Sequence, residues 1–449
     1  MRAGDPGSPP LSPEIAGFVL LAVFLFAIFV GFPVAFTLIF LSLAFGYFAL
    51  GDMVFYLTVL QTIGLMKEEV LAAVPLFIFM GYLLEEGGLM ERLFRAFRLL
   101  LGPVPGSLYV AVLLTATVFG IASGTVGATV AVVGIMAVPT MVRAGYSPRL
   151  SAGAITAGGS LGILIPPSVM LVVMGPVMGV SVPELYAAAF GPGFLLAGIF
   201  IAWTLVRSLI DPRLGPPLPR DERAGSFRAL AAQLALGMLP HVVLTVVTLG
   251  PILAGLATPT EAAGVGVVGT IIMTAAYRTL SWARLKEAVI QTAMQSSMVF
   301  FLAVASNIFG AIFTRLGSAT LLTETLVGLP LPPMGTLLVI MFLIFLLGWP
   351  FEWPAIVFVF VPLLQPSIMT LNFDLLWFAT LIAVNLQTAF LSPPVAMAAY
   401  YLKAVAPDWK LTDIYWGMAE FMVLQVIGLL LLMGFPGIAL WFPRWLYGP

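Results

Sequence analysis

The stretch from Gly120 to Ser168 begins GIASGTVGATVAVVGIMAVPTMV (120–142) and ends GGSLGILIPPS (158–168). It is apolar enough for a membrane interior, yet helical sequence is broken twice within it. The first break, at 120–127, combines three glycines with two hydroxyls, and the second combines two glycines with Pro166-Pro167. Glycine and proline weaken a helix by about 1 and 3 kcal/mol, and proline also removes a backbone donor. We therefore expect two unwound segments at membrane depth.

Unwound backbone in lipid cannot turn to water for hydrogen bonds, so it persists only where protein or a filled cavity satisfies it. Interrupted helices of this kind hold ions and substrates in transporters. The alternative interpretation is a pair of packing kinks between small residues. The same pattern recurs downstream, which favours the transport interpretation.

The composition indicates a polytopic membrane protein. Of 449 residues, 61% are hydrophobic and 9% are charged, whereas about a quarter are charged in soluble domains. The net charge is −1, so we expect no nucleic-acid partner. The chain has no cysteine, which excludes disulfides and thiolate chemistry. Its one histidine, His241, lies in an apolar helix, where packing is the usual role of a histidine.

The first hundred residues predict a tail, membrane helices and an interfacial arm. Residues 1–13 predict a disordered tail, and 15–50 predict two spans divided near Gly31-Phe32-Pro33. An interfacial arm is expected at 52–67 and a further span at 70–84. The segment 91–98 is amphipathic and carries arginines, which indicate the cytoplasmic side.

The segment 106–142 predicts a re-entrant hairpin with its tip at Ser123-Gly124-Thr125. Each half has about 15 residues, fewer than the roughly 20 of a full span. Basic residues lie on both flanks, so the hairpin should enter and leave on the cytoplasmic side. We expect a helix at 148–180 broken around 158–167, then capping-box spacing at Ser181 to Glu184 ahead of a span at 185–209.

A linker and further membrane helices should follow. The stretch 211–228 is rich in proline and arginine and predicts a cytoplasmic linker. Two spans are expected at 234–253 and 259–277, the second opened by a capping box of Thr258 and Glu261. An amphipathic arm at 281–288 and a separate span at 293–316 complete this part of the chain.

The second half then repeats the first. A hairpin is expected at 335–369 with its break at 348–354, and a helix at 374–405 with breaks at 383–388 and 392–394. No Lys or Arg lies between Arg315 and Lys403, so this hairpin should open to the outside. Two similar units of opposite orientation form an inverted repeat. A last span is expected at 414–432, followed by an aromatic belt at Trp441, Trp445 and Tyr447.

Both breaks predict Na⁺ sites, because a desolvated monovalent cation is held by neutral oxygens and by the negative ends of half-helices. The candidate ligands are Ser123, Gly124, Thr125, Gly158, Gly159 and Ser160 in the first repeat, and Gly348, Trp349, Glu352, Asn385, Thr388 and Ser392 in the second. Half-helix N-termini at the same breaks favour an anion, which predicts a carboxylate substrate between the repeats. The candidate substrate residues are Ser123, Pro166, Pro167, Gln387, Pro393 and Pro394.

Glu352 is the only acid of the second hairpin. A carboxylate at membrane depth is costly without a partner. It is therefore either an ion or proton ligand or a residue that faces water.

Five motifs in order carry a family resemblance over nearly the whole chain. They are Pro75-Leu76-Phe77 with Gly81, the Ser-Gly-Thr tip, GGSLGILIPPS, TPTEAA (258–263) and NLQTAFLSPPVAMAAYYLK (385–403). The chain resembles the large, DctM-like membrane subunit of a tripartite ATP-independent periplasmic (TRAP) transporter. The resemblance implies Na⁺-driven symport of a small organic acid by an elevator-type, all-α fold in the cytoplasmic membrane of a bacterium or archaeon. It also implies two protein partners, a small four-helix membrane subunit and an extracytoplasmic substrate-binding protein.

Two departures from the family pattern concern the sites. The first tip in the family commonly has Ser-Gly-Ser-Ser, whereas Thr125-Val126 follow Ser123-Gly124 here, so one hydroxyl is missing. The family commonly has Asp where Glu352 stands, which puts the shape of the second site in question. The NLQT motif (385–388) resembles a subgroup that takes up hydroxy-, oxo- and aromatic acids.

Other functions fit the sequence less well. A one-component Na⁺/dicarboxylate symporter has the same inverted repeat, and absence of a neighbouring binding-protein gene would favour it. An intramembrane protease needs a Ser with a His or paired Asp residues in spans, and His241 lies far from Ser123 in sequence. A channel is disfavoured because two broken repeats suit alternating access. We expect no enzyme activity, no catalytic residue and no organic cofactor.

These expectations divide the chain into consecutive segments. They are a tail (1–13), scaffold helices with an arm (14–100), a first transport repeat (101–183), a span with the linker (184–233), a second set of scaffold helices with an arm (234–330), a second transport repeat (331–410) and a C-terminal span (411–449).

The inverted repeat can be tested by labelling, because the natural chain has no cysteine to interfere. The substitutions Arg95→Cys and Arg143→Cys should react with a membrane-impermeant maleimide only from the cytoplasmic side, and Pro332→Cys only from outside. Labelling of positions 143 and 332 from the same side would remove the inverted repeat.

Overall fold

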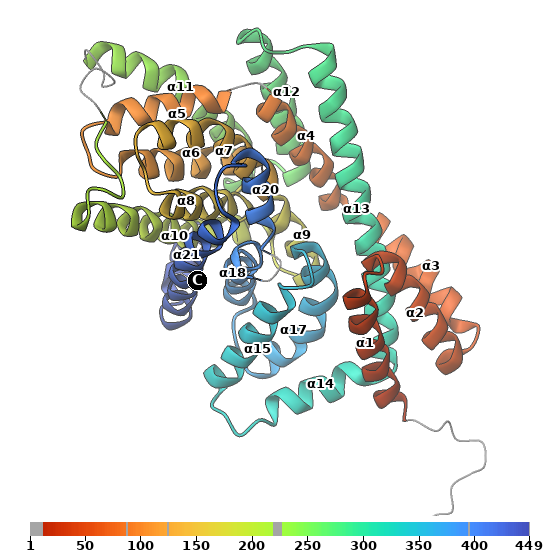
Figure 1. Ribbon diagram of the computed structural model, residues 1–449. Helices are drawn as coiled ribbons and strands as arrows, with labels where there is room; N and C mark the ends of the chain where they lie inside the picture. Colours follow the sequence, from red (N-terminus) through yellow and green to blue (C-terminus); the bar gives the residue numbers. More distant parts are fainter. Residues whose placement is uncertain (1–11, 87–88, 124, 219–226, 394–395, 449) are drawn as a thin grey trace, which may run out of the picture. The chain divides into compact units, whose positions relative to one another are not determined.

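The computed structural model describes residues 12–86, 89–123, 125–218, 227–393 and 396–448, and over these ranges it contains helices and no strand (Figure 1). Most of the predicted N-terminal tail lies outside the described residues. The chain divides into two compact units. The smaller unit comprises Met1–Glu68, Ser297–Leu343 and Pro350–Leu375, and the larger unit comprises Glu69–Ser296, Ile344–Trp349 and Leu376–Pro449.

The smaller unit contains the N-terminal helices and the arms of the second hairpin. Its elements are α1 (Pro13–Val30), α2 (Val34–Leu50), α3 (Met53–Met66), the second part of α13 (Trp282–Arg315), α14 (Ser318–Val327), most of α15 (Pro333–Leu347), α16 (Trp353–Ala355), the π-helical turn η4 (Ile356–Phe360) and α17 (Val361–Thr370). The break between α1 and α2 lies at Gly31 to Pro33, as the sequence predicts.

An aromatic cluster forms the core of the smaller unit. The ring of Phe24 in α1 is fully buried and lies 5.7 Å from those of Phe309 and Phe351 and 6.5 Å from that of Phe360. Ser318 at the start of α14 donates to the Glu14 carbonyl at 2.8 Å. These contacts attach α13, α14, the break of the second hairpin and its second arm to α1.

The larger unit contains the first hairpin and both broken helices. Its elements are η1 (Glu69–Ala72), α4 (Ala73–Glu86), α5 (Leu89–Leu101), α6 (Ser107–Ser123), α7 (Val126–Arg143), α8 (Pro148–Ser160), η2 (Leu161–Ile163), α9 (Val169–Met178), α10 (Val182–Ile210), α11 (Phe227–Leu253), α12 (Pro259–Ala276), the first part of α13, α18 (Leu375–Leu386), α19 (Thr388–Leu391), α20 (Met397–Val405), α21 (Leu411–Gly434) and α22 (Gly437–Tyr447). The helices α6 and α7 pack together as the predicted hairpin.

Helix α8 is the centre of the larger unit. Every residue from Leu150 to Ser160 is buried, and the helix packs against α6, α7 and α21. The approach to α21 is close because two glycines meet there. A Cβ on Gly417 would lie 2.0 Å from the carbonyl oxygen of Arg149, and one on Gly153 would lie 2.6 Å from that of Gly417. Small residues at such crossings let helices pack without a side chain between their backbones.

Several predicted boundaries are wrong, each for a local reason. The arm at 281–288 and the span at 293–316 form one helix, α13, because the sequence contains no proline and a single glycine, Gly310. The short helix α14 was not expected. Ser181 is the N-cap of α10, but its side chain makes no capping hydrogen bond. The capping box of Thr258 and Glu261 is confirmed, with both reciprocal bonds present.

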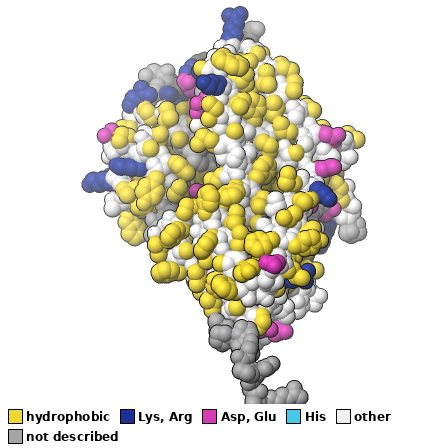
Figure 2. Space-filling model, turned by 90° about the vertical axis from the view of Figure 1, so that its right-hand side faces the viewer, with side chains coloured by type: hydrophobic (Ala, Val, Ile, Leu, Met, Phe, Trp, Pro, Cys, Tyr) yellow, Lys and Arg dark blue, Asp and Glu magenta, His cyan; other side chains and the backbone are white. Residues whose placement is uncertain are grey.

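The surface of the described helices suits a lipid environment. Eight of these helices are long and apolar enough to cross a membrane. Figure 2 shows hydrophobic side chains spread over the face drawn, with few charged groups among them. Large apolar side chains such as Phe48 and Ile210 are exposed, which is costly in water and favourable in hydrocarbon.

The close approach of α8 and α21 predicts a strong effect of one methyl group. We expect Gly417→Ala to destabilise the folded protein by about 1–3 kcal/mol, as overpacking does, and to lower its melting temperature in detergent. The matched control is Gly198→Ala in α10, where nothing lies within 4 Å of the new Cβ. That substitution should leave the melting temperature unchanged or raise it. Equal behaviour of the two variants would show that the helices do not meet at Gly417.

Candidate functional site

The tip of the first hairpin lies where the sequence predicts. Helix α6 ends at Ser123 and α7 begins at Val126, with Thr125 as its N-cap. Gly124 lies outside the described residues, as does the side chain of Ser123. The two arms are slightly longer than expected, with 17 and 18 residues.

The arms of this hairpin pack directly on the first broken helix. A Cβ on Gly120 of α6 would lie 2.4 Å from the Cα of Gly162, and one on Gly159 would lie 2.4 Å from a methyl of Val130 in α7. Only glycine permits such distances between backbones. The first hairpin and the first break therefore form one local structure.

The unwound segment of the first broken helix begins later than predicted. Gly158, Gly159 and Ser160 are still helical in α8, and regular α-helix is absent from Leu161 to Ser168. Two glycines weaken a helix but do not end it, whereas Pro166 and Pro167 lack amide donors and disfavour helix in the residues before them. The whole unwound segment, including both prolines, is buried.

Ser168 connects the two ends of this segment. Its hydroxyl donates to the carbonyl oxygen of Ile163 at 2.5 Å, and it is the N-cap residue of α9. Tyr186 in α10 donates to the Ser168 carbonyl at 3.4 Å. The break is thus held in one shape by hydrogen bonds inside the protein.

The second broken helix has a small irregularity and then a larger one. Helix α18 continues through Asn385 to Leu386, Gln387 separates it from α19, and α19 ends at Leu391 before Ser392. Asn385, Thr388 and Ser392 are each about 1% exposed. The Thr388 hydroxyl donates to the Asn385 carbonyl at 2.6 Å. Pro393 is exposed, and Pro394 lies outside the described residues.

Part of the second hairpin lies beside this helix. Gly348 and Trp349 belong to the same unit, and a Cβ on Gly348 would lie 2.8 Å from the Cβ of Ala389 in α19. Glu352 belongs to the smaller unit, where it is exposed and is the N-cap residue of α16.

The two breaks meet in a buried polar cluster of Ser160, Gln387 and Gln425, which we call the amide cluster. Ser160 donates to the Ala157 carbonyl at 2.9 Å, and its hydroxyl lies 3.5 Å from Gln387 Oε1. Gln425 Nε2 in α21 donates to the same Gln387 oxygen at 2.9 Å. All three side chains are fully buried. The sequence predicts Ser160 and Gln387 as site residues, but not that they adjoin each other.

The amide cluster has unused hydrogen-bonding capacity. Gln387 Nε2 and Gln425 Oε1 are buried without a hydrogen-bond partner, as is the Ser392 hydroxyl. Exchanging oxygen and nitrogen in both amides would again leave one free donor and one free acceptor. Buried amide groups are normally satisfied. The cluster can therefore accept a ligand that offers both an acceptor and a donor.

The linker holds the base of the first hairpin. Gly106 donates its amide to the Gly215 carbonyl at 2.8 Å, and Ser147 donates to the Leu214 carbonyl at 2.9 Å. The Tyr109 hydroxyl also donates to Leu214. The described part of the linker, 211–218, is thus a structural clasp on both ends of the hairpin.

Glu420 in α21 joins the beginning of the broken helix to α10. Its two carboxylate oxygens bind Arg149 at 2.5 Å and Arg207 at 2.9 Å, and its side chain is 14% exposed. Neither Glu420 nor Gln425 is among the predicted site residues. Each is a polar residue in an otherwise apolar span, and polar residues in membrane spans usually have a partner or a function. This signal could have identified both residues from the sequence.

The described residues contain no group of three or more His, Asp or Glu side chains placed to hold a metal ion. A cation at the breaks would therefore need neutral oxygens, of which the buried Asn385, Thr388 and Ser392 offer several.

The sequence matches the family described as "Tripartite ATP-independent periplasmic transporter, DctM component" over residues 20–438. The chain belongs to this family. It is a transporter permease component of the cytoplasmic membrane, not an enzyme, and it is one part of a tripartite transporter with a small membrane subunit and a periplasmic binding protein.

Individual relatives agree with the family assignment. The chain is 31% identical over 371 residues to the isethionate TRAP transporter permease protein DctMQ of Oleidesulfovibrio alaskensis, covering 82% of this chain and 57% of that protein. It is 29% identical over 398 residues to the C4-dicarboxylate TRAP transporter large permease protein DctM of Rhodobacter capsulatus, covering 85% of this chain and 88% of that protein. It is 29% identical over 423 residues to the sialic acid TRAP transporter large permease protein SiaM of Vibrio cholerae, covering 94% and 97%.

A solved structure supports the fold. The Alcanivorax borkumensis YdaH transporter, whose crystal structure has an unusual topology, is similar with a TM-score of 0.63 and 16% identity, covering 96% of this chain and all of that one. The DctM component is accordingly an all-α polytopic protein with two helical hairpins and two broken helices.

The ion pairs of Glu420 predict a measurable loss of stability. Glu420→Gln keeps the side-chain shape but leaves two arginines near each other without their acid. We expect the folded state to lose about 2 kcal/mol, less than a fully buried pair, because the arginines are partly exposed. Thermal melting in detergent measures this. Glu91→Gln is the control, since the exposed Glu91–Arg95 pair should contribute at most about 0.5 kcal/mol.

Proposed function

We propose that this DctM component carries a small organic acid across the cytoplasmic membrane by Na⁺-coupled symport, and that it receives the acid from the binding protein. The observation that supports this proposal is the amide cluster, where the two breaks meet with a free donor on Gln387 and a free acceptor on Gln425. Of the hydroxy- and oxo-acids, a hydroxy-acid matches this pair, because its carboxylate accepts from Gln387 and its hydroxyl donates to Gln425. An oxo-acid offers acceptors alone.

The named relatives support the choice of an acid. Isethionate, C4-dicarboxylates and sialic acid are organic anions. The unwound segment 161–168 follows Ser160 of the amide cluster and leads into α9. The N-terminus of α9 contributes a partial positive charge at the end of this segment. A single anionic group at this depth is tolerable where a helix terminus and amide donors replace its water.

Sodium is the proposed coupling ion. The first site would use the Ser123–Thr125 tip with Gly158 to Ser160, and the second would use Gly348 and Trp349 with Asn385, Thr388 and Ser392. The burial of Asn385, Thr388 and Ser392 supports this, because Na⁺ takes neutral oxygens once its water is removed. Glu352 remains a candidate ligand on the second hairpin.

Alternating access is proposed to follow an elevator movement of the hairpins and broken helices. In support, the linker clasp, the Glu420 ion pairs and the Gly417 contact tie the first hairpin, α8, α10 and α21 together. Elements joined in this way move together rather than separately. The alternative remains a one-component Na⁺/dicarboxylate symporter, which would transport without the binding protein.

Reconstitution tests the proposal. The binding protein is first screened by thermal shift against hydroxy-, oxo- and dicarboxylic acids, and the acid that stabilises it is used labelled. Proteoliposomes with both membrane subunits and the loaded binding protein should accumulate this acid under an inward Na⁺ gradient, and not under a K⁺ or proton gradient alone. Thr388→Ala and Ser123→Ala should raise the Na⁺ concentration for half-maximal uptake.

The role of the amide cluster is tested separately. Gln425→Leu should reduce uptake at least about tenfold, the effect of leaving a buried polar partner unpaired. Gln291→Leu is the control, since its amide donates to Glu287 in its own helix. Uptake unaffected by Gln425→Leu would exclude the cluster as the substrate site, equal uptake with K⁺ would exclude sodium coupling, and robust uptake without binding protein would favour the one-component alternative.

A further inference from the structure

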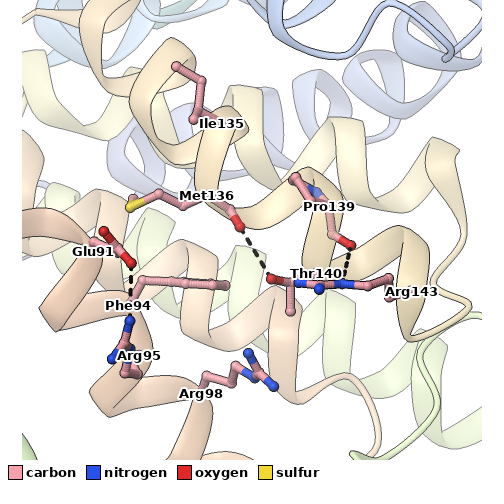
Figure 3. Close-up of a pocket in the computed structure, with 9 residues that line it drawn as sticks. All are labelled: Glu91, Phe94, Arg95, Arg98, Ile135, Met136, Pro139, Thr140 and Arg143. Atoms are coloured by element: carbon pink, nitrogen blue, oxygen red, sulfur yellow. Dashed lines mark hydrogen bonds and ion pairs between the residues drawn. The ribbon is translucent and has the colours of Figure 1, made fainter.

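A basic groove lies between α5 and the second arm of the first hairpin, α7. It has a volume of about 420 Å³. Figure 3 shows its lining, which is Glu91, Phe94, Arg95, Arg98, Ile135, Met136, Pro139, Thr140 and Arg143. Both helices belong to the larger unit, and neither contributes the residues of the amide cluster.

The polar part of the groove is mostly basic. Its lining contains three arginines and one acid, and that acid, Glu91, is bound to Arg95 at 3.1 Å and not to Arg143. Arg143 uses its Nε to donate to the Pro139 carbonyl at 3.2 Å, which fixes the guanidinium at the edge of the groove and leaves its terminal nitrogens for other acceptors. In the view of Figure 3, Arg98 lies between Arg95 and Arg143.

The arginines of α5 are not all alike. The guanidinium of Arg92 lies 4.8 Å from the centre of the ring of Tyr277, the residue that follows α12, and so has an aromatic partner outside the groove. Arg95 and Arg98 instead line the groove. The arginines of α5 that line the groove are therefore distinct from the one that contacts an aromatic ring elsewhere.

The rest of the groove is apolar. Phe94, Met136 and Pro139 line it, together with Ile135, whose side chain is 60% exposed. Ile135 lies two turns from Arg143 on α7, so the apolar part and the charged part lie at different depths along this helix. A groove with a cationic end and an apolar end matches an amphiphile with an anionic head.

We propose that this groove binds an anionic phospholipid of the cytoplasmic leaflet, with its phosphate on Arg95 and Arg143 and an acyl chain along Ile135 and Met136. Guanidinium groups pair with phosphate oxygens in a fixed fork geometry. Basic pockets between membrane helices on the cytoplasmic side are sites for such headgroups, and the arginines themselves indicate this side. A bound lipid would connect α5 to the hairpin.

Lipid binding by the full chain tests the proposal. Purified protein in a neutral detergent is titrated with short-chain phosphatidylglycerol, phosphatidylcholine or inorganic phosphate, and binding is followed by native mass spectrometry and thermal shift. Phosphatidylglycerol should bind and raise the melting temperature, and added salt should weaken it. The double variant Arg95→Gln/Arg143→Gln should bind about 25-fold more weakly, at about fivefold per arginine. Arg213→Gln, an exposed arginine elsewhere, should bind as the natural protein does.

Each other result overturns the proposal in a defined way. Equal binding of phosphatidylcholine would remove the role of charge, and equal protection by inorganic phosphate would make the ligand a soluble anion. Phosphatidylglycerol binding that the double variant retains would place the lipid elsewhere. If the double variant does not fold, Arg143→Gln alone is used with an expected fivefold loss, since this exposed side chain bonds only locally to Pro139 in its own helix among the contacts described.

Discussion

The structure depends on one constraint of the bilayer, that every backbone polar group must be satisfied within the protein. In the first broken helix, several backbone groups of Leu161 to Ser168 find partners within the protein, although two prolines prevent regular helix there. The Leu164 and Ile165 amides turn back to the Leu161 carbonyl, and the Ser168 hydroxyl bonds that of Ile163. The segment is buried, and side-chain atoms of the amide cluster and Ser392 are buried beside the breaks without a hydrogen-bond partner. Such atoms are available to a ligand that the transporter must also release.

A site of this kind needs a stiff surrounding. Glycines supply it where backbones touch, at Gly120 with Gly162 and at Gly417 with Arg149, since no side chain stands between the helices. Glu420 adds a charge-assisted connection between α8, α10 and α21, and the linker adds backbone bonds to both ends of the hairpin. Burying a charged group in a membrane protein costs free energy, so such groups are rare there. Breaking the Glu420 ion pairs would leave buried charge unpaired and is therefore strongly unfavourable. Rigid connection around a polar centre is what a domain that moves as one piece requires.

The arginines have two roles at once. As sequence, those at 95, 98, 143 and 149 predict that both ends of the first hairpin lie on the cytoplasmic side. As structure, Arg149 is neutralised by Glu420, which Arg207 also binds, and Arg95, Arg98 and Arg143 line one groove. An arginine that sets the orientation of a membrane helix lies near the membrane boundary, where the lipid headgroups are. The same arginine can therefore also bind a lipid headgroup.

The sequence by itself determined the positions of both hairpin tips and both broken helices, because proline and glycine act on their own backbone and apolar length is a local property. It also determined the family, through motifs spread over the chain. It placed the first unwinding three residues early, at Gly158 and not Leu161, because packing on α6 and α7 preserves the helix through Ser160 although glycines weaken it. It also divided α13 into two helices, although no residue breaks the helix there. Only the tertiary structure decided that the first break meets the second at Ser160 and Gln387, and that Gln425 and Glu420 from the last span complete these contacts. Those residues are far apart in the chain, and pairing between distant residues arises from how helices pack, which no local pattern of sequence encodes.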